Sequence, residues 1–102
     1  MVEKPMSFEE AQAVVATKTA PKVTKESIEA KIDNVFYLME MTTTICIIVM
    51  NNGFKVIGHS TPASAYNYDK DVGMAYAYDN AFRQLWPLEG YLLREKLSKE
   101  EK

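Results

Sequence analysis

The sequence feature that most constrains the fold is the tripeptide Asn51-Asn52-Gly53, which separates two apolar, β-branched runs. An Asn-Gly pair tolerates the positive φ angles of a tight hairpin turn. We therefore predict a type I′ turn between a strand over residues 45–50 and a strand over residues 54–59. Apolar residues occupy both faces of the first run, which predicts a central strand covered on both sides.

Helices and a further strand are predicted around this hairpin. Residues 33–41 are rich in aromatic residues and alternate with period two, which is typical of a strand. Ser7 and Glu10 have the spacing of a capping box, so a helix is expected over residues 8–17. From residue 69 to residue 97 the pattern is helical, and Pro87 inside it predicts a kink or a break near Trp86.

These elements predict an α+β fold with an N-terminal helix, a three-stranded antiparallel meander and a long kinked C-terminal helix. We expect an N-terminal arm or helix over residues 1–22, a compact domain over 23–97 and a charged tail over 98–102.

Composition excludes several classes of function. The 102 residues contain 12 Lys and Arg against 14 Asp and Glu, so the net charge of −2 argues against coating of long nucleic acid. The longest apolar stretch, residues 45–50, is too short to span a bilayer, and no membrane partner is expected. The lone cysteine, Cys46, allows no intrachain disulfide, and the N-terminus does not resemble a signal peptide. We therefore expect a cytoplasmic protein.

Catalytic residues are scarce. His59 is the only histidine, Cys46 lies in the most apolar strand, and the four glycines are too dispersed for a phosphate loop. Too few ligands are present for a zinc site. We expect no enzyme activity, no metal and no cofactor.

Binding of a small nucleotide is better supported, because aromatic faces stack on bases, amides pair with base edges and arginines fork onto phosphates. The loop and helix after His59 contain Tyr66, Tyr68, Tyr76 and Tyr78. An alternative is that these tyrosines only pack the helix on the sheet. One helical turn separates Asn80 from Arg83, whereas Arg94 is expected to reach the same ligand only from a neighbouring subunit. The candidate ligand-binding residues are Ser60, Thr61, Tyr66, Asn67, Tyr68, Asn80, Arg83 and Arg94.

The C-terminal helix carries more apolar residues than one contact with a three-stranded sheet requires, which predicts a homo-oligomer. The alternative is that the N-terminal arm covers the surplus. The candidate interface residues are Met74, Tyr78, Ala81, Leu85, Leu88 and Leu92.

Two sequence blocks resemble a family of small tailed-phage proteins. The blocks are Asn52-Gly53-Phe54, followed by Val56-Ile57-Gly58-His59-Ser60, and Trp86-Pro87-Leu88-Glu89-Gly90-Tyr91-Leu92-Leu93. The resemblance covers about residues 23–97, and the chain departs from the family pattern at residues 59–62.

The resemblance is to a family expected to include phage anti-Thoeris proteins, which act as sponges for cyclic ADP-ribose isomers. Some such sponges also hold the cyclic oligonucleotides of CBASS defence. The resemblance implies a protein that sequesters a cyclic nucleotide signal, without cleaving it, in the cytoplasm of an infected bacterial host. The alternative is a phage structural or protein-interaction module with no small-molecule ligand. The identity of the nucleotide, the choice between dimer and hexamer, and the role of the N-terminal arm stay open.

Overall fold

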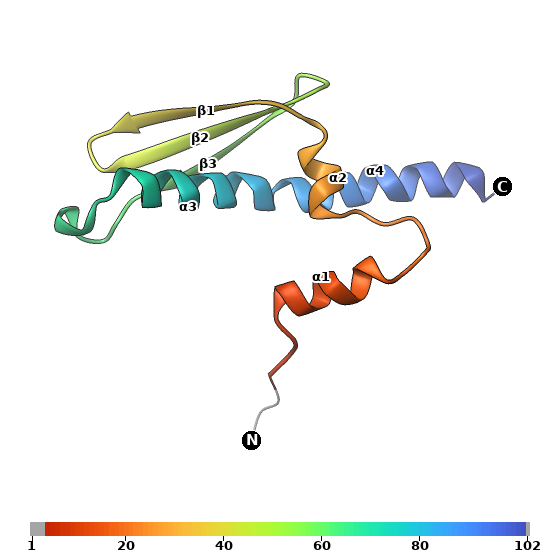
Figure 1. Ribbon diagram of the computed structural model, residues 1–102. Coiled ribbons are helices and arrows are strands. Elements are labelled where there is room, and N and C mark those ends of the chain that lie inside the picture. Colours follow the sequence, from red (N-terminus) through yellow and green to blue (C-terminus); the bar gives the residue numbers. More distant parts are fainter. Residues whose placement is uncertain (1–3, 102) are drawn as a thin grey trace.

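The structure is a computed structural model that describes residues 4–101. Figure 1 shows a three-stranded sheet with a long, bent helical segment across one face and a separate N-terminal helix. This arrangement confirms the predicted α+β fold. The elements are α1 (Phe8–Ala16), α2 (Lys25–Glu29), β1 (Ile32–Glu40), β2 (Thr43–Met50), β3 (Lys55–Ser60), the 3₁₀ turn η1 (Ala65–Asn67), α3 (Lys70–Arg83) and α4 (Leu85–Glu100).

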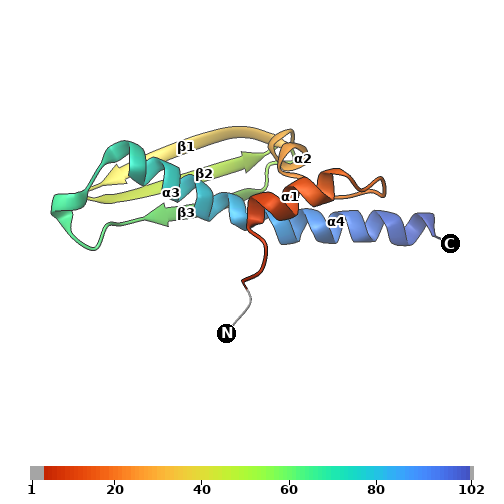
Figure 2. The same ribbon diagram turned by 60° about the horizontal axis from the view of Figure 1, so that its bottom comes forward.

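The sheet has the order β1-β2-β3, and both pairs of strands are antiparallel. The helix α3 lies on one face (Figures 1 and 2), and every second residue of β2, from Thr44 to Met50, is buried beneath it. On the opposite face, Phe36, Leu38 and Ile57 are at least half exposed. Within residues 4–101 the chain covers one face of the sheet only, and the outer residues of β2 itself are half-buried. Cover of the second face, as predicted for the central strand, would have to come from outside residues 4–101.

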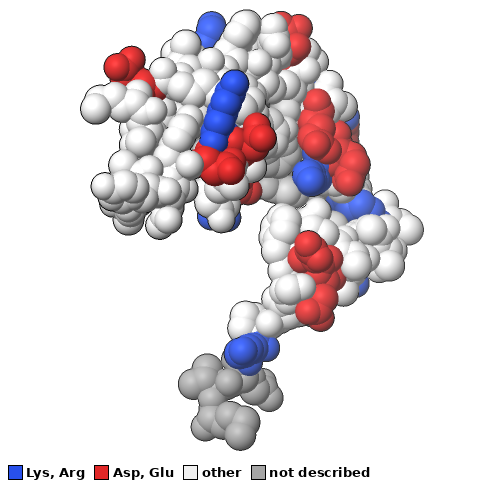
Figure 3. Space-filling view, turned by 60° about the vertical axis from the view of Figure 1, so that its left-hand side comes forward, with Lys and Arg blue, Asp and Glu red and all other residues white. Residues whose placement is uncertain are grey.

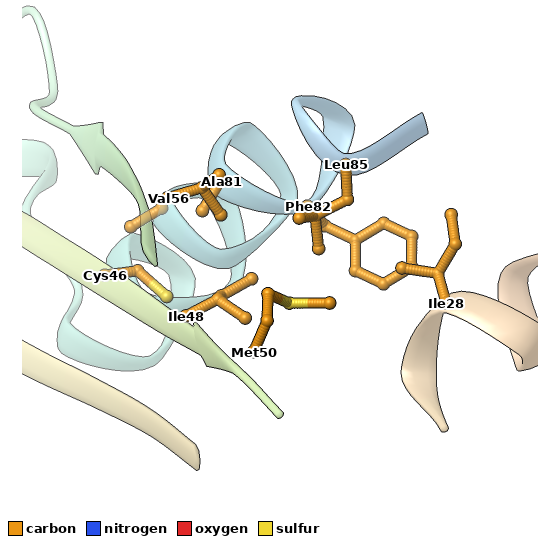
Figure 4. Close-up of a cluster of buried hydrophobic side chains, with 9 residues drawn as sticks. Ile28, Cys46, Ile48, Met50, Val56, Ala81, Phe82 and Leu85 are labelled. Carbon is orange, nitrogen blue, oxygen red and sulfur yellow. The ribbon is translucent and has the colours of Figure 1, made fainter. Parts of the chain in front are cut away.

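The hydrophobic core lies between the inward face of the sheet and the helices. Met50 extends from the end of β2 toward Phe82 of α3 and Ile28 of α2 (Figure 4). At the centre, α3 approaches β3 so closely that a β-carbon on Gly58 would lie 2.3 Å from the Ala81 backbone nitrogen. The buried apolar residues are Ile28, Cys46, Ile48, Met50, Val56, Ala77, Ala81, Phe82 and Leu85.

The hairpin between β2 and β3 is present, but its turn differs from the prediction. Gly53 has a φ of 88°, whereas Asn52 does not have a positive φ. The Gly53 N–H donates to the Met50 carbonyl and the Met50 N–H donates to the Phe54 carbonyl, both at 2.8 Å. These bonds enclose three residues, so a type I turn followed by glycine replaces the two-residue type I′ turn.

The long helical segment is interrupted at Gln84, and its axis bends by 26°. Pro87 explains the position of the break, because proline has no N–H for the carbonyl four residues earlier, which belongs to Arg83. The predicted kink is confirmed. α4 then continues to Glu100, so part of the predicted charged tail is helical.

The helix α1 begins with the predicted capping box, in which the Ser7 hydroxyl accepts from the Glu10 N–H. It has no buried residue, and it lies apart from the sheet (Figures 1 and 2). Phe8 contacts Trp86 of α4 edge-to-face, with ring centroids 5.8 Å apart. Residues 1–3 of the predicted arm and residue 102 of the tail lie outside the described residues. Among residues 4–101, no helix has the length and apolar character needed to cross a bilayer.

Candidate functional site

A cavity of about 270 Å³ lies where β3 ends and α3 begins. The loop between them is shaped by local caps: the Ser64 hydroxyl accepts from the Tyr66 N–H, and Asp69 Oδ1 accepts from the Val72 N–H. We call this cavity the loop pocket; its lining residues are Ser60, Thr61, Pro62, Asn67, Tyr68, Asp69, Val72, Gly73 and Tyr76.

Close packing of the helix on the sheet holds the loop pocket in place. Thr44 on β2 is the register partner of Ser60 on β3. A β-carbon on Gly73 of α3 would lie 2.6 Å from Thr44 Oγ1, so a larger residue there would displace the Thr44 hydroxyl. The Thr44 hydroxyl is buried and has no hydrogen-bond partner among the described residues. The start of α3 is therefore pressed directly against the sheet beneath the pocket.

The structure brings together half of the predicted ligand-binding residues, namely Ser60, Thr61, Asn67 and Tyr68. The Thr61 hydroxyl is 2.8 Å from the Thr43 hydroxyl, which ties the loop to β2. Tyr66 is fully exposed and does not line the pocket. The grouped residues offer hydroxyls, an amide and an aromatic ring within one concave surface.

The other predicted ligand-binding residues lie elsewhere on the chain. Asn80 Oδ1 accepts a hydrogen bond from the His59 N–H at 3.1 Å. Arg83 pairs with Asp79 (2.8 Å), and its side chain is 76% exposed. Arg94 pairs with Glu101 at 2.9 Å on α4. None of the three lines the loop pocket within one chain.

A larger cavity, of about 510 Å³, lies between the β2–β3 turn and α4. It was not predicted as a ligand site, although Leu85, Leu88 and Leu92, which line it, were predicted as interface residues. An ion pair between Lys31 and Glu89 lies at this cavity. The two sequence blocks that carry the family resemblance meet here, since each supplies lining residues. We call it the α4 groove; it is lined by Lys31, Met50, Asn51, Asn52, Phe54, Leu85, Leu88, Glu89, Tyr91 and Leu92.

The predicted interface residues divide into three groups by burial. Ala81 and Leu85 are buried in the core of a single chain, and Met74 and Tyr78 are half-buried. Leu88 and Leu92 are 40% and 51% exposed. Packing within one chain therefore accounts for the apolar character of the first two, whereas the last two leave an apolar surface on α4.

Burial also affects the titration of three groups under α3. Burial is the largest cause that raises the pKa of the Cys46 thiol and the pKa values of the Tyr37 and Tyr78 hydroxyls. The neighbouring Cys46 raises both tyrosine pKa values further, and Glu29 adds to the effect on Tyr78. All three groups are therefore held in their neutral forms, which is the opposite of what a thiolate or phenolate nucleophile requires.

Charge is dispersed over the face seen in Figure 3. In the view of Figure 3, acidic and basic side chains form small groups of mixed sign that are separated by wide uncharged areas. No cluster of three metal-binding side chains occurs within residues 4–101. This face therefore has no broad field of one sign that would attract a charged partner from a distance.

Comparison with protein families gives one match, which spans residues 23–97. Since the match covers most of the chain, the protein belongs to the phage protein (N4 Gp49/phage Sf6 gene 66) family. The match begins just before α2 and ends within α4, so it includes the sheet, both cavities and α3, and it leaves α1 outside. Comparisons with curated proteins and with solved structures gave no match.

Proposed function

We propose that this phage protein binds a cyclic nucleotide immune signal of the host and sequesters it intact. The observation that carries the proposal is the convergence of Ser60, Thr61, Asn67 and Tyr68 on the loop pocket. An aromatic face stacks on a base, an amide pairs with a base edge, and hydroxyls bond ribose or phosphate oxygens. Membership of a phage protein family agrees with an anti-defence role.

The size of the pocket favours a ligand shared between subunits. Pockets for drug-sized ligands measure about 300–1,000 Å³, and the loop pocket offers about 270 Å³. One base with its ribose fits such a space, and the rest of a cyclic nucleotide must be held from outside. We therefore propose a homo-oligomer in which exposed cations such as Arg83 reach the ligand from a neighbouring subunit.

Sequestration also agrees with the chemistry of the lining. The one carboxylate of the pocket, Asp69, is occupied as the N-cap of α3 through its bond with the Val72 N–H. The lining contains no histidine, lysine or cysteine. A ligand in this pocket would meet donors and acceptors rather than a nucleophile with a general base, and tight binding needs no bond to break.

The proposal is tested by retention. The protein is incubated with a panel of cyclic ADP-ribose isomers and cyclic oligonucleotides, freed of unbound ligand by gel filtration, and then denatured by heat. Mass spectrometry of the supernatant should recover one of these nucleotides unchanged. Recovery of a cleaved product would identify an enzyme, and absence of any retained nucleotide would overturn the proposal.

A second candidate is a protein-interaction module without a small-molecule ligand. Exposed apolar residues on the outer face of the sheet favour it, as do Phe54 and Leu92 in the α4 groove, which are 53% and 51% exposed. This candidate predicts no retained nucleotide in the same experiment, so one measurement separates the two functions.

A further inference from the structure

The two edges of the sheet differ in how their backbone groups are satisfied. At the β3 edge, Asn80 Oδ1 accepts from the His59 N–H, and Gln84 Nε2 donates to the Ile57 carbonyl at 2.7 Å. These side chains occupy backbone groups that point away from β2, where an added strand would pair. The C-terminal half of α3 and Gln84 therefore partly close the β3 edge.

The β1 edge is open from Tyr37 to Met39. The Val35 N–H donates to the side chain of the adjacent Asn34 at 2.8 Å, so it points away from β2. Backbone groups alternate in direction along an antiparallel strand. Those of Tyr37 and Met39 consequently face the same open side, and no side chain among residues 4–101 hydrogen-bonds to them there.

The composition of β1 does not protect this edge. Edge strands are usually guarded by lysine, proline, a bulge or an inward charge. Residues 35–39 form an uninterrupted apolar run without lysine or proline, and the irregularity of the β1–β2 ladder lies before it, between Ile32 and Asn34. Phe36 and Leu38 on the outer face are 50% and 56% exposed. An open, apolar edge of this kind is a site of strand pairing.

The chain taken by itself is extended rather than compact. Its radius of gyration is 16.9 Å, whereas a compact chain of this length has about 13 Å. Its accessible surface is 7,941 Å², against about 5,800 Å² for a folded monomer of this mass. The separate α1 and the end of α4 carry part of this excess.

We propose that the β1 strands of two copies pair antiparallel and join the two sheets into one sheet of six strands. The strand is complementary to itself in one register, centred on Tyr37. Phe36 then lies opposite Leu38 of the second copy, and Val35 lies opposite Met39 of the second copy. Asn34 meets Glu40, so apolar residues face apolar ones and polar residues face polar ones. This self-complementarity identifies the occupant as a second copy rather than an unrelated strand.

The pairing does not require a nucleotide, so its test is separate from that of the proposed function. The mass of the ligand-free protein is measured by light scattering after gel filtration at micromolar concentration. We expect a dimer or an assembly of dimers. The double variant Phe36→Lys, Leu38→Lys should have half that mass or less. The control Ile57→Lys changes an outer-face residue of similar exposure on the partly closed β3 edge and should keep the wild-type mass.

A monomeric wild type would overturn the proposal. So would disruption by Ile57→Lys as well as by the double variant, because that result indicates face-to-face packing of sheets. Circular dichroism and thermal unfolding of each variant show whether a change in mass reflects loss of fold.

Cysteine cross-linking tests the register of the pairing without introducing charged residues. Paired strand residues that share no hydrogen bonds lie about 4.5 Å apart at Cα, within reach of a disulfide. A mixture of Phe36→Cys and Leu38→Cys chains with different tags should form the mixed disulfide dimer under mild oxidation. Ile57→Cys and the wild type, whose Cys46 is buried, should stay unlinked. Cross-linking of Ile57→Cys, or none in the mixture, would contradict the pairing.

Discussion

Gly58 on β3 lies directly against Ala81 on α3, so that a β-carbon on the glycine would be 2.3 Å from both the Ala77 carbonyl oxygen and the Ala81 backbone nitrogen. Neither backbone atom can move without shifting α3. We expect Gly58→Ala to lower the free energy of unfolding by more than about 2 kcal/mol. Urea denaturation measures the change.

Gly90 supplies the matched control for this substitution. It lies in α4, and a β-carbon there would meet nothing within 4 Å. Gly90→Ala should raise the free energy of unfolding by up to about 1 kcal/mol, because alanine is the better helix former. If the two variants change stability equally, the close packing of α3 on β3 is not as described.

The second prediction concerns the hairpin turn. Gly53 has a φ of 88° in open space, so a side chain there meets a backbone penalty and no steric neighbour. Gly53→Val should cost about 1 kcal/mol or more. Asn52→Ala, which removes only the exposed bond from the Phe54 N–H to Asn52 Oδ1, should cost less. A melting temperature unchanged in Gly53→Val would place the positive φ elsewhere.

The third prediction is a loss of stability at alkaline pH. The pKa values of Tyr37, Cys46 and Tyr78 are raised in the folded protein, chiefly by burial. The unfolded chain therefore releases these protons at a lower pH than the folded chain does. The unfolded state then binds fewer protons, so the free energy of unfolding falls as pH rises above roughly 9 and is unaffected by these groups near neutrality.

Urea titrations between neutral pH and pH 10.5 measure this slope. Tyr78→Phe keeps the ring and removes the titrating hydroxyl, so its stability should fall less steeply with pH than that of the wild type. Identical slopes in the two proteins would show that Tyr78 ionises as readily folded as unfolded.

The fourth prediction tests which of the two cavities binds the nucleotide. Tyr68→Ala should weaken binding of the retained cyclic nucleotide about ten-fold or more, because a stacking face is lost. Tyr91→Ala removes a tyrosine of the α4 groove instead and should leave the affinity unchanged. Isothermal titration calorimetry measures both. The reverse result would move the ligand to the α4 groove, and equal binding by all three proteins would place it outside both cavities.

Local signals in the sequence predicted the elements well. Ser7 caps the helix that follows as predicted, because a capping box needs only residues three positions apart. The predicted type I′ turn was wrong because a two-residue loop and a three-residue loop differ only in which residues of the two strands pair. The hydrogen bonds of Met50 show that three residues form the loop. The alternation of β2 showed two apolar faces but could not show which of them the chain itself covers.

The candidate site was predicted in part for a similar reason. Thr61, Asn67 and Tyr68 are close in sequence, so one loop was enough to gather them. Asn80 was predicted to face a ligand, whereas within the chain its side chain bonds the β3 edge, a relationship that depends on strand order. The α4 groove was not predicted as a cavity, because its walls come from three distant segments; only its residues Leu85, Leu88 and Leu92 were predicted, as an interface. The two family blocks were the signal that could have found it.

The edge-to-face contact between Phe8 and Trp86 joins α1 to α4, and this attachment should open more often than the rest of the fold. α1 has no buried residue, so it can detach while the sheet stays intact. Its amide hydrogens should therefore exchange with solvent through frequent local opening, whereas those of β2 exchange only in rare global unfolding. A protease that cuts between residues 17 and 23 would then release α1 and leave a resistant core that coincides with the segment matched by the family.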